Sequence, residues 1–325
     1  MITYISDATK YVYHYTRATT ALDYILRDRT LQLSPYTATN DPKETKTWDF
    51  DLITFENRDL KPYKRSELSK WLSDELKSRA KVVCFSMDRP PLSGEHMKDI
   101  YRRGYAKARM WAQYSDKHSG VCLVFDRERL LAAINRHFGQ HSLMHGNVRY
   151  ADAELVRGIE HHEFNIDIDL YESLGAKAYV SWHLQRHHRR LFFEKLVDWR
   201  DESEWRIVLL TEEATSLYLP IDDSLVAVAH GDATDPDISE ALMAQTKNEE
   251  IQHLGISWKN SSPWYDYGSF GWIPGKVTCP RRPSPDRGVD QKVRVNWASL
   301  SRTKVTYLPT LLLTEFSSRA RSIHP

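Results

Sequence analysis

The chain has 325 residues, of which 41% are hydrophobic and 27% are charged, and its formal net charge is +1. This is the composition of an ordinary globular protein with enough apolar residues for a substantial core. The net charge near zero excludes nucleic-acid binding driven by overall charge, so any such binding would need a local basic patch.

The three cysteines, Cys84, Cys122 and Cys279, lie far apart, and two of them fall in expected strands. A small, odd number of separated cysteines is typical of a reducing compartment and not of a disulfide framework. The first residues lack the basic start and apolar run of a signal peptide. No apolar segment approaches the roughly 18 residues that would cross a membrane. We therefore expect a cytoplasmic location and no membrane partner.

Hydrophobic periodicity predicts strands and helices along most of the chain. Strands are expected at 10–16, 31–34, 81–87, 120–126, 147–150, 204–210, 216–219, 225–230 and 251–256. Helices are expected at 18–29, 66–80, 101–115, 127–138 and 237–247, with a mostly helical stretch over 153–194 and loops at 141–146 and 261–268. The pattern predicts one α+β domain, residues 1–257, and an irregular C-terminal extension, residues 258–325, with short strands at 293–297 and 305–313.

Residues 195–210, with the sequence KLVDWRDESEWRIVLL, bring a dense group of charges next to an apolar run. Alternation from Ser203 onward predicts a strand, which would place Glu202, Glu204 and Arg206 on one face of a sheet. Such a face is either a solvated edge with compensating charges or the site of a catalytic carboxylate that a neighbouring arginine keeps ionised. The pattern by itself leaves both interpretations open.

Aromatic and imidazole side chains supply further candidates. His14 lies in mid-strand, on the face opposite Tyr13 and Tyr15, and is either a structural residue or a neutral imidazole that binds a ribose hydroxyl or a carboxamide. Trp111 and Tyr114 are three residues apart in an expected helix and share one face of it. They are either core residues or a stacking wall for a planar ring.

His183 and His187 have the i, i+4 spacing of zinc ligands, with Arg186 between them. The glutamate that a zinc hydrolase places after its first histidine is absent, and the neighbouring arginines would repel a cation, so we expect no metal. A basic patch for phosphate or RNA, or a solvated helix face, explains this segment better. The phosphate-binding P-loop, the GxGxxG motif and the GxSxG motif are also absent from the sequence.

Six short motifs follow one another in a fixed order. They are Tyr13-His14-Tyr15-Thr16, Leu31-x-Leu33-Ser34, Asn40-Asp41-Pro42-x-Glu44, Cys84-Phe85-Ser86, Trp111-x-x-Tyr114 with the following Gly120–Asp126, and Lys195-x-x-x-Trp199-x-x-Glu202-x-Glu204-x-Arg206. This series resembles the bacterial domain-of-unknown-function family 2971, over about residues 10–232. That family is similar in turn to the ADP-ribosyltransferase superfamily. The resemblance implies an α+β fold with a mixed or antiparallel split sheet and flanking helices.

The resemblance also implies roles for particular residues. His14 would bind the ribose of NAD, Tyr114 would stack on the nicotinamide, and Glu204 would hold the 2′-hydroxyl of the nicotinamide ribose. Glu202 would activate the acceptor as a general base, and Arg206 would keep Glu204 ionised. NAD is then a substrate, and no metal is needed. The remaining candidates are Thr16, Ser86 and Trp111 for NAD, and Asn40, Glu44 and Arg186 for the acceptor.

The expected function is therefore that of an NAD-dependent ADP-ribosyltransferase, an intracellular toxin or phage-defence effector that modifies a protein or a nucleic acid. An effector of this kind implies an antitoxin or a defence-system partner. The alternative is a non-enzymatic module on the same fold that binds nucleic acid or a partner protein through the His/Arg segment. A metal-dependent hydrolase built on His183 and His187 is the third hypothesis.

Overall fold

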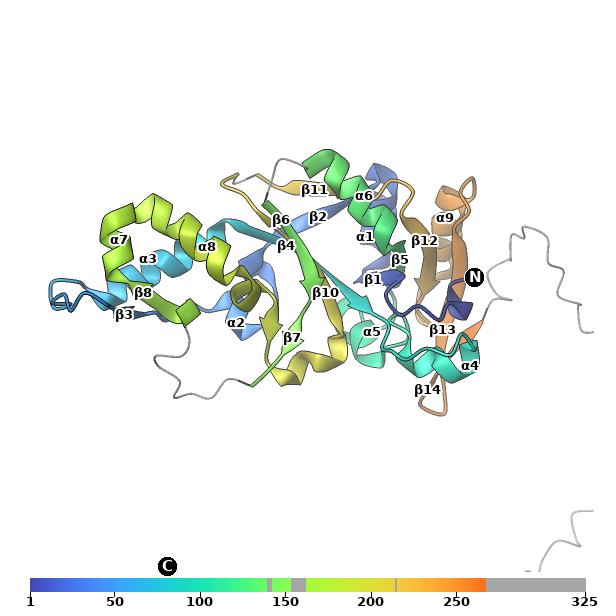
Figure 1. Cartoon of the computed structure of the whole chain (residues 1–325). Helices are drawn as coiled ribbons and strands as arrows, with labels where there is room; N and C mark the ends of the chain where they lie inside the picture. The colour runs from blue at the N-terminus through green and yellow to red at the C-terminus, as the bar shows by residue number, and fades with distance from the viewer. Residues whose placement is uncertain (139–141, 153–161, 214, 267–325) are drawn as a thin grey trace, which may run out of the picture. The chain divides into compact units, whose positions relative to one another are not determined.

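A computed structural model describes residues 1–138, 142–152, 162–213 and 215–266 (Figure 1). All of them belong to one compact unit, residues 1–274. The expected strands at 293–297 and 305–313 lie outside the described residues. None of the helices among the described residues is long and apolar enough to cross a bilayer.

Ten strands form the main sheet, and two further pairs of short strands flank it. The main sheet consists of β1 (Tyr11–Thr16), β2 (Thr30–Pro35), β4 (Ala80–Met87), β5 (Val121–Asp126), β6 (Ser142–Asn147), β10 (Glu204–Leu210), β11 (Leu217–Pro220), β12 (Leu225–His230), β13 (Gln252–Lys259) and β14 (Ser262–Asp266). The short pairs are β3 (Asp51–Ile53) with β8 (Asn165–Asp167), and β7 (Arg149–Tyr150) with β9 (Glu194–Lys195).

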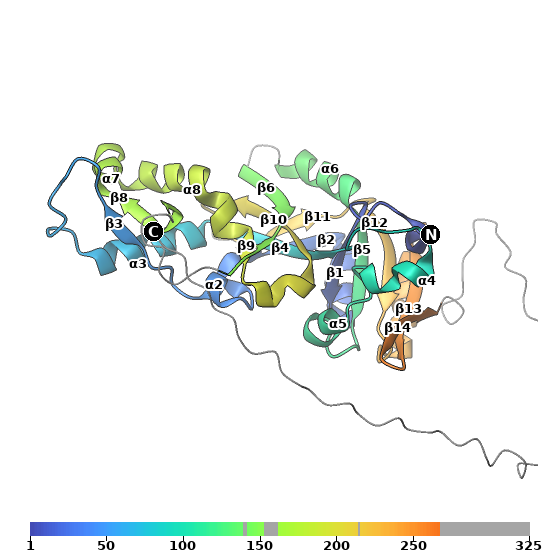
Figure 2. The same cartoon turned by 60° about the horizontal axis from the view of Figure 1, so that its bottom comes forward.

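The helices are distributed around this sheet. They are α1 (Ala18–Thr20), which continues as a π-helical segment (Ala21–Leu26), α2 (Pro42–Thr45), α3 (Arg65–Ser78), α4 (His96–Asp99), α5 (Ala108–Tyr114), α6 (Arg127–Phe138), α7 (Ile168–Leu174), α8 (Ala176–Phe192) and α9 (Pro236–Thr246). Short 3-10 helices occupy Ile2–Tyr4, Tyr36–Ala38, Ile100–Arg102, His162–Phe164 and Val197–Glu202. Helices α3, α7 and α8 gather at the end of the unit that lies away from β12, β13 and β14 (Figure 2).

The main sheet runs in the order β11-β2-β4-β1-β5-β12-β13-β14, and β10 and β6 extend it from the other edge of β4. Its paired strands are antiparallel except for β12 and β13, which are parallel. The predicted α+β class, with a mixed and largely antiparallel sheet, is therefore confirmed.

Strand β4 is where the sheet splits. On one edge it pairs with β10 along its whole length, from Glu204 opposite Ser86 to Leu210 opposite Ala80. On the other edge it pairs first with β2, at Val82 and Lys81, and later with β1, at Ser86 and Met87. Within the described part of the chain, no partner strand covers this edge between the two short ladders. A gap in the sheet is left there, bordered by β1, β2 and β4.

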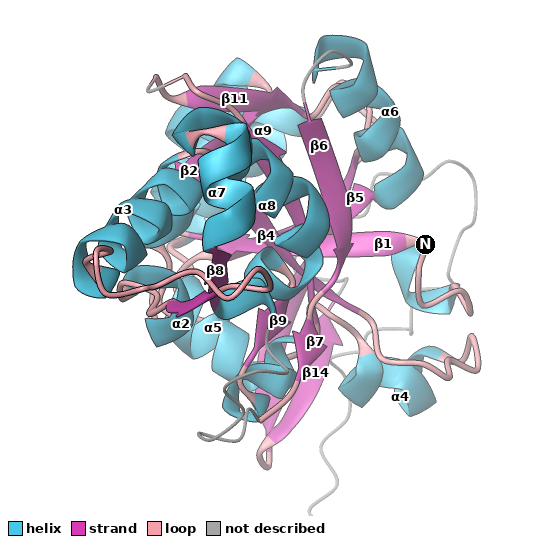
Figure 3. Ribbon diagram, turned by 60° about the vertical axis from the view of Figure 1, so that its left-hand side comes forward, coloured by secondary structure: helices cyan, strands magenta, loops and turns pink. Residues whose placement is uncertain are grey.

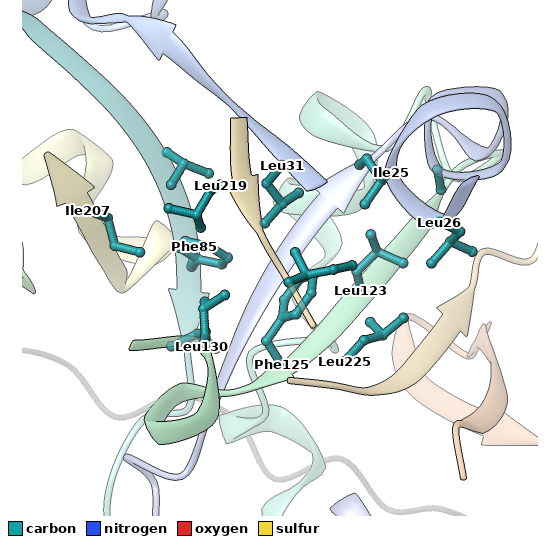
Figure 4. Close-up of a cluster of buried hydrophobic side chains, with 14 of the residues drawn as sticks. Ile25, Leu26, Leu31, Phe85, Leu123, Phe125, Leu130, Ile207, Leu219 and Leu225 are labelled. Carbon is teal, nitrogen blue, oxygen red and sulfur yellow. The ribbon is translucent and has the colours of Figure 1, made fainter. Parts of the chain in front are cut away.

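The two faces of the sheet are covered differently. One face carries a continuous core against α1, α6 and α9, with Ile25, Phe85, Phe125 and Leu219 among its buried residues (Figure 4). The other face carries two separate clusters. Helices α3 and α8 pack on β4 and β10, and α5 packs on β1, β5, β12 and β13. Figure 3 shows α8 in front of β4.

Several expected boundaries differ from the observed ones. The helix expected over 101–115 is confined to α5, because Asp88 holds the preceding turn: its Oδ1 accepts from the Gly104 amide at 2.7 Å, and its Oδ2 from Arg103 at 3.0 Å. The Tyr13 ring also lies where a Cβ of Gly104 would be, at 2.1 Å. Residues expected as loops form β6, through long-range pairing with β10, and β14, through a hairpin with the preceding strand β13. Strand β13 crosses residue 257, where the first domain was expected to end.

Candidate functional site

The gap beside β4 opens into a cavity of about 300 Å³. Strands β1, β2 and β4 contribute its sheet-side wall. The remainder comes from the 3-10 helix Tyr36–Ala38 with the following loop, α5, β9, the 3-10 helix Val197–Glu202 and the start of β10. Residues from all six sequence motifs line it: Tyr13, His14, Tyr15, Gln32, Ser34, Ala38, Thr39, Asn40, Val82, Val83, Cys84, Phe85, Ser86, Met110, Tyr114, Lys195, Glu202 and Glu204. Residues that are up to 191 positions apart in the sequence therefore line one space.

His14 is held in one orientation by the uncovered edge of β4. Its Nδ1 lies 3.1 Å from the carbonyl oxygen of Cys84, a residue of β4 that lies between the ladders of β1 and β2. Because a carbonyl can only accept, Nδ1 carries the proton, and Nε2 is left as an acceptor. Burial lowers the pKa of His14 below 6.5, which keeps the ring neutral. The ring can therefore accept a hydrogen bond from a hydroxyl group in the cavity.

Glu204 and Arg206 project from the same face of β10, as their spacing predicted. Arg206 donates from Nε to one oxygen of Glu204 at 2.6 Å and from Nη2 to the other at 2.9 Å. Lys195 Nζ lies 2.7 Å from Glu204 Oε2. Burial raises the pKa of Glu204, but Arg206 and Lys195 outweigh burial and hold the pKa at about 2. The carboxylate is therefore ionised, and its two oxygens, which can accept about four hydrogen bonds, use three on these cations.

Glu202 reaches the cavity by a different route from the one expected. It ends the 3-10 helix Val197–Glu202 and does not lie on β10, because Ser203 turns the chain with a left-handed backbone (φ 44°). The Glu202 carboxylate nevertheless faces the cavity, where Oε1 accepts from the Tyr114 hydroxyl at 2.7 Å and Oε2 lies 3.0 Å from Lys195 Nζ. Burial, followed by the charge of Glu202, raises the pKa of Tyr114, so the phenol remains protonated and donates.

The turn at Ser203 is fixed by a clamp of buried polar groups. Lys107 Nζ donates to the carbonyl oxygen of Glu202 at 2.9 Å and to Ser86 Oγ at 2.8 Å, and Ser86 donates to the same carbonyl. The Met87 amide donates to the Ser203 carbonyl at 2.9 Å. Burial lowers the pKa of Lys107 to about 7. The clamp fixes the backbone from which the Glu202 side chain projects. Ser86 therefore has two roles, because it lines the cavity and also holds the turn that carries Glu202.

The Asn40-Asp41-Pro42-Lys43-Glu44 segment forms the start of α2. Asp41 caps the helix by accepting from the Lys43 amide at 2.9 Å, and Pro42 occupies the first helical position. Asn40 lines the cavity. Glu44 points inward and is fully buried, with Oε1 2.6 Å from Arg206 Nη1. Glu44 therefore supports Arg206 from behind and does not line the cavity.

Besides Glu44 and Arg206, which lie behind Glu204, three further predicted residues lie outside the cavity. Thr16 pairs with Val121 at the end of β1 and does not line the space. Trp111 is fully buried, where its Nε1 donates to the Tyr105 carbonyl at 2.8 Å, so it cannot stack on a ligand in the cavity. Arg186 lines a second cavity of about 580 Å³ on α8, together with residues of β3, the 3-10 helix at 162–164, β8 and α7.

The histidines of α8 are packed into the structure. His183 is fully buried, and its ring centroid lies 4.6 Å from that of His187. Its Nε2 lies 3.0 Å from the carbonyl oxygen of Glu163. Burial and the neighbouring His187 lower the pKa of His183 to about 3, so its ring is neutral. Among the described residues, no group of three or more His, Cys, Asp and Glu side chains is placed to hold a metal ion.

Two lysines at the site were not among the predicted residues. Lys195 lies between Glu202 and Glu204 and also over the Trp199 ring, at 5.3 Å from its centroid. Its place as the first residue of the charged motif was a signal that could have identified it. Lys107 has no such signal, because its role depends on the distant carbonyl of Glu202.

Residues 110–207, from α5 to β10, match a family model described as a protein of unknown function, DUF2971. The match confirms the resemblance to that family over this segment, which contains Tyr114, Lys195, Glu202, Glu204 and Arg206. His14 and the Asn-Asp-Pro motif precede it. No curated protein and no solved structure matches the chain.

Proposed function

We propose that this chain, which carries the DUF2971 segment over residues 110–207, is an NAD-dependent ADP-ribosyltransferase that acts in the cavity beside β4. The observation that carries the proposal is that His14, Tyr114 and Glu204 line the same cavity, although they come from β1, α5 and β10. A cavity of about 300 Å³ lies at the small end of the ligand-site range, which suits a nucleoside-sized part of NAD.

The residues suit cleavage of the nicotinamide–ribose bond. The bond breaks with its electron pair moving to the ring nitrogen, so nicotinamide leaves as a neutral molecule and positive charge develops on the ribose. Glu204, ionised and desolvated, stabilises that charge and accepts a hydrogen bond from a ribose hydroxyl. Nε2 of His14 accepts from another hydroxyl, and the Tyr114 ring supplies a wall for the nicotinamide.

The acceptor attacks the same carbon as nicotinamide leaves. Its lone pair forms the new bond to ribose, and its proton moves to Glu202, which is the candidate general base. The clamp formed by Lys107 and Ser86 holds the backbone of Glu202. Lys195 links the Glu202 and Glu204 carboxylates, at 3.0 Å and 2.7 Å, so both can act on one transfer. The acceptor in this proposal is a macromolecule, either a protein or a nucleic acid. As a toxin or phage-defence effector, the chain would also have an antitoxin or a defence-system partner.

The test is to incubate the purified protein with NAD labelled on the adenylate phosphate and with cell lysate. Transfer of label to macromolecules supports the proposal, and digestion with protease or nuclease then identifies the acceptor class. Glu204→Gln is the informative variant, because alanine would remove the buried hydrogen-bond acceptor that Arg206 and Lys195 share, whereas glutamine keeps one acceptor oxygen. Glu213→Gln, an exposed glutamate outside the cavity, is the matched control. Absence of transfer and of NAD hydrolysis by the wild-type protein contradicts the proposal.

A second candidate is a binding module without catalysis. The observation that favours it is the cavity on α8, which Trp182, Arg186, His187 and Arg190 line. Planar bases stack on aromatic rings, and phosphates pair with arginine, so single-stranded nucleic acid is the suited ligand. Binding that weakens steeply with salt and with Arg186→Ala, but not with Glu204→Gln, would favour this function.

A further inference from the structure

The cavity carries an excess of negative charge. Three carboxylates, Glu44, Glu202 and Glu204, are linked with two cations, Lys195 and Arg206, by contacts of 2.6–3.0 Å. Three negative charges and two positive charges leave one negative charge. His14 adds none, because burial lowers its pKa and keeps it neutral. Lys107 lies behind Ser86 and can alter this net charge. Burial lowers its pKa to about 7, so near neutral pH it contributes at most one positive charge.

The two cations are already committed to carboxylates. The Arg206 guanidinium donates to Glu204, to Glu44 and to the carbonyl of Phe192. Lys195 bridges Glu202 and Glu204, and it is the only lysine or arginine among the described residues that line the cavity. A diphosphate in the cavity would have to compete with carboxylates that are about 3 Å from these cations, and it would meet their repulsion.

The wall of the cavity suits a flat, positively charged ring. Phe85, Met110, Tyr15 and Tyr114 line it. Aromatic faces attract cations, and more strongly where water is excluded. The Tyr114 hydroxyl donates to the carboxylate of Glu202 at 2.7 Å, which adds electron density to the phenol ring. The acidic groups lie beside this wall, so an attached ribose would meet Glu204 and His14 while the ring faces the aromatic side chains.

We infer that this cavity is a site for cationic pyridinium nucleosides, which it recognises by the positive charge on the ring and without a diphosphate subsite. The inference rests on the proposed function for the identity of the substrate. Beyond the proposed function, it assigns most of the binding free energy of NAD to the nicotinamide–ribose end of the molecule. The adenosine diphosphate end then lies outside the charged part of the cavity and contributes little to binding.

Binding is measured by titration calorimetry with four ligands: nicotinamide riboside, its reduced dihydro form, NAD and ADP-ribose. The first two differ by one charge at nearly constant size. We expect the oxidised riboside to bind at least about tenfold more tightly than the reduced form, and NAD to bind less than about tenfold more tightly than the riboside. Equal affinity for the two ribosides, or an advantage of about tenfold or more for NAD, overturns the inference.

Glu202→Gln provides the second arm, because glutamine keeps an acceptor for the Tyr114 hydroxyl and removes one negative charge. The variant is expected to weaken binding of the oxidised riboside by about tenfold and to leave the reduced form unchanged, whereas Glu213→Gln changes neither. Equal weakening of both ribosides would indicate altered shape and would contradict the inference. These are equilibrium measurements, so they decide the inference even if the protein neither transfers ADP-ribose nor hydrolyses NAD, which would be a failure of the proposed function alone.

Discussion

Arg206 donates two hydrogen bonds to the Glu204 carboxylate, from Nε at 2.6 Å and from Nη2 at 2.9 Å, and both side chains are buried on one face of β10. This fork-shaped pairing orients the carboxylate plane as well as keeping it ionised. Glu44, on α2, pairs with the remaining side of the guanidinium at 2.6 Å. The carboxylate that faces the cavity is therefore held by a chain of charges that reaches from β10 to α2.

Arg206→Met should destabilise the fold strongly, because it leaves Glu44 and Glu204 as buried carboxylates without their guanidinium. Breaking a buried pair in this way costs about 3–5 kcal/mol in the free energy of unfolding, which urea titration measures. Arg136→Met is the matched control, since Arg136 also lies 2.6 Å from a carboxylate, that of Asp222, but is exposed. The control should cost less than about 1 kcal/mol. Similar losses in the two variants would contradict the role given to burial.

Gly231→Ala should also destabilise the protein. A Cβ at this position would lie 1.9 Å from the carbonyl oxygen of His118, and backbone cannot move aside as a flexible side chain can. Overpacking of this kind costs about 1–3 kcal/mol. Gly146→Ala is the control, because its Cβ would meet only ordinary contacts of 3.7 Å or more. Thermal unfolding of both variants is compared with that of the wild type. A loss of stability in Gly231→Ala but not in Gly146→Ala assigns the effect to steric overlap, and equal losses would assign it to the replacement of glycine in general.

Stability should fall as the pH drops below about 6.5. Burial is the main cause that lowers the pKa of His183 and His230 to about 3 and that of His253 to about 4. The unfolded chain binds these protons as the pH falls through about 6.5, whereas the folded chain binds them only near pH 3 to 4. Between these pH values, protonation of the histidines therefore favours the unfolded state. Each histidine should cost about 2 kcal/mol at pH 5, measured by urea unfolding at pH 7.5 and 5.0.

His253→Gln tests the origin of that pH dependence. The imidazole of His253 lies 2.8 Å from His230 and 2.9 Å from the Thr246 hydroxyl. Glutamine can bond to both neighbours without titrating. The variant should therefore lose less stability than the wild type between pH 7.5 and 5.0, by about 2 kcal/mol. An unchanged loss would mean that other groups cause the pH dependence.

Affinity for a cationic nucleoside should rise between pH 6 and pH 8, since Lys107 loses its proton there and the cavity becomes more negative. Burial is the main cause of its lowered pKa. Arg89 lowers the pKa further, and Asp88, Asp201 and Glu202 raise it. Titration with nicotinamide riboside across this range measures the effect. In Lys107→Met the affinity should not change with pH, and a persistent rise in that variant would assign the titration to another group.

Sequence alone was sufficient where structure depends on near neighbours. Strand alternation put Glu204 and Arg206 on one face of β10, because successive side chains of a strand point to opposite sides. The Asn-Asp-Pro motif indicated a turn, since Asp and Pro favour that backbone locally. The same local reasoning missed β6 and β14, which exist because β10 and β13 supply their hydrogen bonds.

Only the tertiary structure decided which of these residues meet. The break between the ladders of β1 and β2 along β4 makes the cavity, and it results from strand register between residues that are about 46 to 75 positions apart in the sequence. Whether an aromatic residue stacks on a ligand or fills the core also depends on distant packing, which buries Trp111 and leaves Tyr114 at the cavity. Charge networks follow the same rule. A sequence lists Glu44, Lys195 and Arg206 as separate charges, and the fold alone brings them within hydrogen-bonding distance of shared partners.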